Sequence, residues 1–86
     1  MAYNMTKANM IEHLKDDAEY FPFEQIRAFK LLQKQPIEID ENVKKDYLAF
    51  FRDVKKECER LIQNERNNSN RDLWEEAIEE INKILK

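Results

Sequence analysis

None of the 86 residues of this chain is glycine. Glycine supplies positive φ angles at low cost, and hairpin turns, bulges and phosphate-binding loops depend on it. The chain is also 38% charged, and its apolar residues recur every three to four positions. That spacing is the period of an α-helix with one apolar side. We therefore expect an all-α protein whose helices are joined by short connections.

The spacing of apolar residues, caps and prolines predicts four helices. We expect them over about residues 6–20, 22–35, 41–66 and 70–85. Thr6 and Asp40 are suited to cap the first and third helices, and Pro22 is tolerated in the first turn of the second. Pro36 biases the residue before it away from helical geometry. The Phe21-Pro22 corner therefore predicts a tight turn between the first two helices.

Two short connections complete the expected chain path. Ile37-Glu38-Ile39 reads as an extended link, and Asn67-Asn68-Ser69-Asn70 as a turn in which Ser69 or Asn70 caps the last helix. Because short loops make consecutive helices antiparallel, the long third helix and the fourth should form a hairpin. Helices one and two then close the exposed half of the third. The prediction is one helical domain over residues 1–86, a small up-and-down four-helix bundle.

Composition limits the environment in which such a chain works. The single cysteine, Cys58, cannot form an internal disulfide, which fits a reducing compartment. The first residues contain no continuous apolar segment, so we expect a cytoplasmic protein with no membrane span. The abundance of Lys, Asn and Ile is typical of AT-rich coding sequence, as in low-GC bacteria and their phages. A net charge of −3 argues against a general affinity for phosphate backbones.

Catalytic and cofactor-binding patterns are missing from the sequence. Phosphate loops and dinucleotide fingerprints need glycine. His13 is the single histidine, and it is better explained by a pair with Asp17 or with solvent than as a metal ligand or a base. Ser69 lies in a turn with no base nearby in sequence. The carboxylates fall on outward helix faces, where no burial raises their pKa. We therefore expect no enzyme, no metal and no cofactor.

Basic side chains gather on one side of two of the predicted helices. A ridge on helix two and a stripe on helix three contain Arg27, Lys30, Lys34, Lys44, Lys45, Arg52, Lys55 and Lys56. These faces could dock an acidic partner or contact phosphates. They could equally be solvated faces, partly neutralised by acids of helix four. Those acids form a ridge of their own, made of Glu75, Glu76, Glu79 and Glu80. That acidic ridge suits the helix dipole and could also hold a basic partner.

Three apolar residues fall among these charges. Phe23, Leu31 and Leu48 project toward largely charged arcs, so each is either covered by a neighbouring helix or part of an exposed contact patch. Any ring of the Tyr20-Phe21-Pro22-Phe23 corner that stays outside would be an anchor for another protein. Phe21 itself is expected in the core.

Two further residues are expected in the core. Trp74 lies on the flank of the apolar stripe of helix four, and its indole N–H needs an acceptor. Cys58 belongs to the apolar stripe of helix three and reads as a small buried hydrophobic residue.

These features favour a small non-enzymatic protein that binds another protein, as an inhibitor, adaptor or immunity-type partner. A nucleic-acid-associated regulator that uses the basic faces of helices two and three is an alternative. Its helix-turn-helix form is disfavoured because the Phe21-Pro22 break is shorter than the usual three to four residues. A self-associating structural subunit is the third possibility, since a homodimer could use the same apolar residues.

Overall fold

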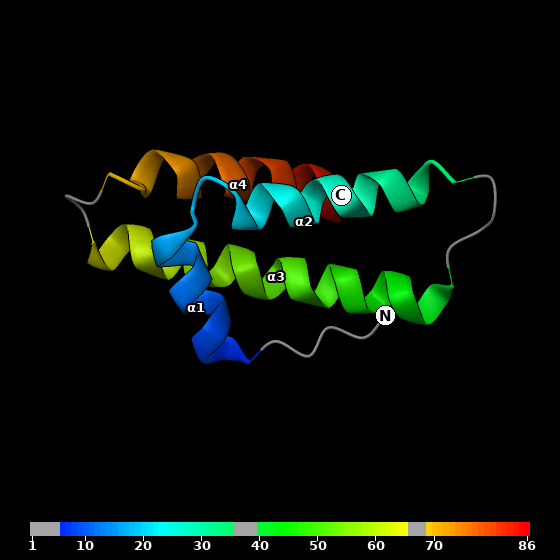
Figure 1. Cartoon of the computed structure of the whole chain (residues 1–86), viewed down its shortest axis with the longest axis horizontal. Coiled ribbons are helices and arrows are strands. Elements are labelled where there is room, and N and C mark those ends of the chain that lie inside the picture. Colours follow the sequence, from blue (N-terminus) through cyan, green and yellow to red (C-terminus); the bar gives the residue numbers. More distant parts are fainter. Residues whose placement is uncertain (1–5, 36–39, 66–68) are drawn as a thin grey trace.

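The computed structural model describes residues 6–35, 40–65 and 69–86. In this part of the chain it contains four helices, namely α1 (Lys7–Asp16), α2 (Phe21–Gln33), α3 (Glu41–Asn64) and α4 (Arg71–Leu85). The molecule measures 44 × 23 × 20 Å (Figure 1). α3 and α4 are the most closely packed pair of helices, as the predicted hairpin requires. The predicted fold class, an all-α bundle of four helices, is therefore confirmed.

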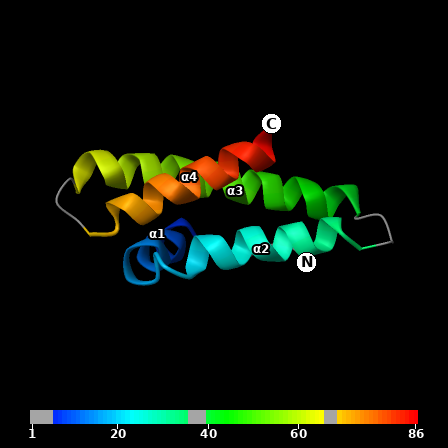
Figure 2. The ribbon, with the colours of Figure 1, turned by 90° about the horizontal axis from the view of Figure 1, so that it is seen from above.

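Three of the helices follow the long axis, and the first crosses it. α2 and α4 run in the same direction, and α3, which lies between them in the sequence, runs in the opposite direction (Figure 1). α1 lies across α3 near the end from which α2 starts, as both views show (Figures 1 and 2). The up-and-down arrangement thus describes α2 to α4, while α1 closes one end of the bundle.

The first connection differs from the predicted two-residue corner. α1 ends at Asp16 and not near Tyr20, because Asp17 has left helical geometry with φ −124° and ψ 38°. A turn follows, in which the N–H groups of Tyr20 and Phe21 both donate to the Asp17 carbonyl, at 2.9 and 2.8 Å. α2 then begins at Phe21, so Pro22 lies in its first turn, where no intrahelical N–H bond is lost.

The helix caps follow the prediction at two of the three ends. Thr6 Oγ1 accepts the Asn9 N–H at 3.2 Å, and Asp40 Oδ1 accepts the Asn42 N–H at 2.7 Å. Asn70 precedes α4, but its side chain makes no cap hydrogen bond.

The other helix ends differ slightly from expectation. α2 ends at Gln33, two residues before the expected end, in a turn closed by hydrogen bonds to Leu31 and Leu32. α3 ends at Asn64. The extended link predicted at Ile37-Glu38-Ile39 and residues 66–68 lie outside the described residues.

An aromatic cluster holds α2 against α3. The Phe29 ring of α2 packs against Tyr47 and Phe51 of α3, with ring centroids 5.3 and 5.6 Å apart. Phe21 meets Phe50 edge-on at 6.0 Å, which confirms that Phe21 belongs to the core. Edge-on and tilted rings at these separations add to the burial energy of their surface.

Candidate functional site

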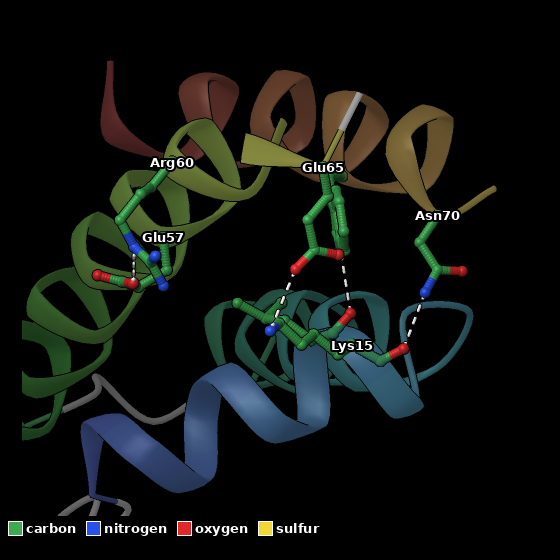
Figure 3. A network of polar contacts seen from close by, with 7 residues as sticks. Lys15, Glu57, Arg60, Glu65 and Asn70 are labelled. Atoms are coloured by element: carbon green, nitrogen blue, oxygen red, sulfur yellow. Dashed lines mark hydrogen bonds and ion pairs between the residues drawn. The ribbon is translucent and has the colours of Figure 1, made fainter. Parts of the chain in front are cut away.

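The end of α1 is fastened to α4 by side chains (Figure 3). The indole nitrogen of Trp74 donates to the Leu14 carbonyl at 2.8 Å. The amide of Asn70 donates to the Lys15 carbonyl, also at 2.8 Å (Figure 3). Lys15 in turn pairs with Glu65 at 3.1 Å. The last carbonyls of a helix have no intrahelical partner, so these donors satisfy groups that would otherwise need water. The core position predicted for Trp74 is confirmed, and these contacts fix the turn that follows α1.

A buried carboxylate lies on α3, contrary to the expectation that the carboxylates all face outward. Glu57 is 3% exposed because α1 covers this side of α3. Its oxygens contact Arg60 Nε at 2.9 Å and Lys7 Nζ at 3.4 Å. Burial raises the pKa of the Glu57 carboxyl, but hydrogen bonds and charges from Arg60 and Lys7 outweigh it and lower the pKa below its ordinary 4.5. Glu57 is therefore an ionised structural group.

The two residues with the most reactive side chains have structural surroundings. Cys58 is fully buried, as predicted, and burial, followed by the charges of Glu59 and Glu57, raises the pKa of its thiol to about 12. His13 lies 3.3 Å from Asp17, as predicted, and stacks on Phe21 with centroids 5.1 Å apart. Within the described residues no group of three or more His, Cys, Asp or Glu side chains could hold a metal ion.

The outward side of α2 carries the most exposed apolar surface. Among the residues that the structure describes, two large hydrophobic side chains are exposed, Tyr20 at 62% and Leu31 at 56%. By the helical period, Leu31 and Tyr20, the residue that precedes α2, fall on one line whose members are spaced alternately four and three residues apart. We call this line the outer face of α2; it comprises Tyr20, Glu24, Arg27, Leu31 and Lys34, all of them exposed. No helix covers α2 on its outer side in the view from above (Figure 2).

Of the three apolar residues that the sequence places among charges, Leu31 alone is exposed. Phe23 and Leu48 are half-buried and pack against the core, which is the covered alternative for each. The ring left outside at the corner is Tyr20, which sequence reasoning did not single out. Counting back along this line from Arg27, three residues lead to Glu24 and four more lead to Tyr20, so the helical spacing would have placed Tyr20 on it.

The basic residues predicted on α2 have unequal surroundings. Lys30 pairs with Glu80 of α4 at 3.4 Å, and the same carboxylate contacts Lys83 at 3.0 Å. The hydrogen bonds of Lys83 and Lys30 lower the pKa of Glu80. Within the described residues Arg27 and Lys34 have no ion pair. Within the described ranges, the outer face of α2 therefore keeps two cations without an ion pair.

The basic stripe on α3 lies open to solvent. Four of its members, Lys44, Lys45, Arg52 and Lys56, are exposed, and Lys55 is half-buried. In the described part of the chain none of the five has an ion pair, so the expected partial neutralisation by acids of α4 is found at Lys30 of α2 and not on this stripe. Of the acidic ridge on α4, Glu75 instead pairs with Arg71 of its own helix at 3.4 Å. Glu76 and Glu79 of the same ridge are exposed.

A depression adjoins Tyr20 between the α1–α2 turn and the start of α4. It encloses about 320 Å³. Its lining includes the carboxylates of Asp16, Asp17 and Glu19, beside the Tyr20 ring. A cationic side chain would be attracted to this concave, negatively charged surface.

Comparison with known proteins adds no relative. No protein-family model matches the chain, and neither a curated protein nor a solved structure does. None of the helices in the described ranges combines the length and the apolar character that crossing a bilayer requires. The physical properties of the outer face of α2 therefore carry the functional argument.

Proposed function

We propose that this protein acts without catalysis, by binding another protein through the outer face of α2. The observation that carries the proposal is the shared position of Tyr20 and Leu31, the two exposed large hydrophobic side chains of the described residues. Binding sites concentrate their energy in a few such anchors, with tyrosine among the most frequent.

The surroundings of the two anchors suit a specific contact. Arg27 lies between them and Lys34 beyond Leu31, both exposed and without ion pairs in the described residues. Charges at the rim of an interface select the partner and accelerate association more than they add affinity. An inhibitor, an adaptor or an immunity-type partner in the cytoplasm would use such a face.

The test compares capture of partners by matched variants. The tagged wild-type protein, Leu31→Asp and Ala49→Asp are expressed in the native cell, and captured proteins are identified by mass spectrometry. Ala49 is an exposed residue of α3, so its variant adds the same charge to another helix. We expect a partner that the wild type and Ala49→Asp retain and that Leu31→Asp loses. Equal capture by all three proteins would contradict the proposal.

Nucleic-acid binding through the α3 stripe is the second candidate. The observation that favours it is the row of exposed lysines and arginine without ion pairs in the described residues. The first connection is also longer than the sequence indicated, so its length no longer disfavours a helix-turn-helix. However, Glu24 lies in the first turn of α2 and acidic residues of the depression precede it, at the end where a recognition helix would approach DNA.

Salt dependence separates the two candidates. Phosphate binding by several cations weakens steeply as salt is added, whereas an apolar anchor responds little. We expect the wild type to show no binding to duplex DNA or to RNA at about 50 mM salt. Binding that is lost in the variant Lys44→Glu combined with Arg52→Glu would favour the nucleic-acid candidate instead.

A further inference from the structure

The outer face of α2 has opposite charges at its two ends. Near its start lie Glu24 and, in the preceding turn, the carboxylates that line the depression beside Tyr20. Arg27 lies at its middle and Lys34 at its end. A face that is acidic at one end and basic at the other is complementary to itself when a second copy is turned end for end.

The positions of the residues match this reversal closely. In an antiparallel pair of α2 helices centred between Gln25 and Ile26, Tyr20 of one copy lies opposite Leu31 of the other. In the same register Glu24 lies opposite Arg27. The alternating spacing of four and three residues is the one that lets two helices keep a common seam. Each apolar anchor thus meets an apolar anchor, and each central charge meets its opposite.

The depression beside Tyr20 extends the match. In the same register Lys34 of the second copy falls beyond the start of α2, on the side of the turn whose carboxylates line the depression. Glu24, Arg27 and Lys34 have no ion pair within the described residues, so none has to leave a partner first. We propose that this protein forms a two-fold symmetric dimer through antiparallel α2 helices, with Tyr20 against Leu31 and Glu24 against Arg27. The inference rests on the proposed function, since it names a second copy as the partner of that face.

The dimer should be weak. One helix per protomer buries less than the roughly 1,200 Å² at which standard protein interfaces begin. We expect a dissociation constant on the order of 100 µM, and weakening by salt because an interface one helix wide leaves the Glu24–Arg27 pairs open to solvent. Sedimentation equilibrium from about 10 µM to about 1 mM covers that range.

Charge exchange tests the register. In a dimer of Glu24→Arg the introduced arginine faces Arg27 twice, and in a dimer of Arg27→Glu the introduced glutamate faces Glu24 twice. Each variant alone should therefore dimerise at least about tenfold more weakly. An equal mixture of the two variants restores both pairs with opposite charges. The double variant E24R/R27E also restores them, within a homodimer. We expect wild-type association in both cases.

The controls change the same charges elsewhere. Glu76→Arg and Arg52→Glu alter exposed residues of α4 and α3 and should associate as the wild type does. Circular dichroism checks that all variants keep their helix content. A wild type that stays monomeric up to about 1 mM, or single variants that the mixture does not restore, would overturn the inference.

Different experimental results would contradict the dimer and the proposed function. A monomeric wild type that still captures a partner through Leu31 keeps the proposed function and assigns the face to a different protein. A monomeric wild type whose capture is unaffected by Leu31→Asp removes both.

Discussion

The indole nitrogen of Trp74 lies 2.8 Å from the carbonyl oxygen of Leu14, across a sequence separation of 60 residues. This contact joins the start of the last helix to the end of the first and lies in the core of the protein. Beside it, the Asn70 side chain donates to the next carbonyl, that of Lys15 (Figure 3). The turn that carries Tyr20 follows directly, so the position of the exposed ring depends on these two hydrogen bonds.

Replacing Trp74 by Phe should destabilise the protein by about 2–4 kcal/mol. The substitution leaves the buried Leu14 carbonyl without its donor and also leaves a small cavity. The loss is a large part of the roughly 4–13 kcal/mol expected for a domain of this size. Urea unfolding followed by circular dichroism measures it.

The matched control for this change is Asn70→Ala. Its carbonyl partner, Lys15, lies at an exposed site and can bond to water instead, so a loss of only about 0.5–1.5 kcal/mol is expected. A Trp74→Phe protein as stable as the wild type would show that the indole hydrogen bond contributes nothing.

Acid should remove the contribution of Glu57 to stability. Its pKa is lowered in the folded state, so the folded protein binds this proton less tightly than the unfolded chain does. The contribution is therefore present above the unfolded value of 4.5 and is lost as the pH falls through the lower folded value. Glu57→Gln should cost about 1–2 kcal/mol at pH 7 and progressively less below pH 4.5.

Urea unfolding of both proteins at a series of pH values tests this dependence. Glu59→Gln is the control, because Glu59 is an exposed neighbour on the same helix. A difference between wild type and Glu57→Gln that stays constant through the acid range would contradict the assigned pKa direction.

The Cys58 thiol should be inert to alkylation in the folded protein. A pKa of about 12 leaves on the order of one thiolate in ten thousand at pH 8, and the side chain is fully buried. Iodoacetamide at pH 8 should react only through opening of the fold, and rapidly in denaturant. The Trp74→Phe variant should react faster by the factor by which its open population rises, about tenfold for each 1.4 kcal/mol of lost stability. Native labelling as fast as that of free cysteine would refute the burial.

Local signals in the sequence were enough to predict the helices and most of the core. Apolar spacing, the Thr6 and Asp40 caps and the two prolines act within a few residues, so the four helices and the α3–α4 hairpin could be predicted. The end of α1 could not, because side chains of α4 satisfy its last carbonyls. The burial of Glu57 could not be predicted for the same reason. Its position on α3 is an outward one, and a different helix, α1, covers it.

The candidate site was predictable only in part. Leu31 and Arg27 could be placed on the outer side of α2 from the helical period alone. Tyr20 was missed because the sequence assigned it to the end of α1, whereas in the structure it is the residue that directly precedes α2. The half-buried positions of Phe23 and Leu48 could not be predicted without knowing which helix covers each of them.

Stability and binding should separate at neighbouring positions of α2. Phe29 is 1% exposed and packs on α3, so Phe29→Ala should cost about 3–5 kcal/mol and unfold much of the protein. Leu31 is 56% exposed, so Leu31→Ala should change the free energy of unfolding by no more than about 0.5 kcal/mol. Yet Leu31→Ala removes an apolar anchor and should weaken the dimer measured by sedimentation equilibrium. A large loss of stability in Leu31→Ala would mean that this side chain belongs to the core, and the outer face of α2 would then lack its second anchor.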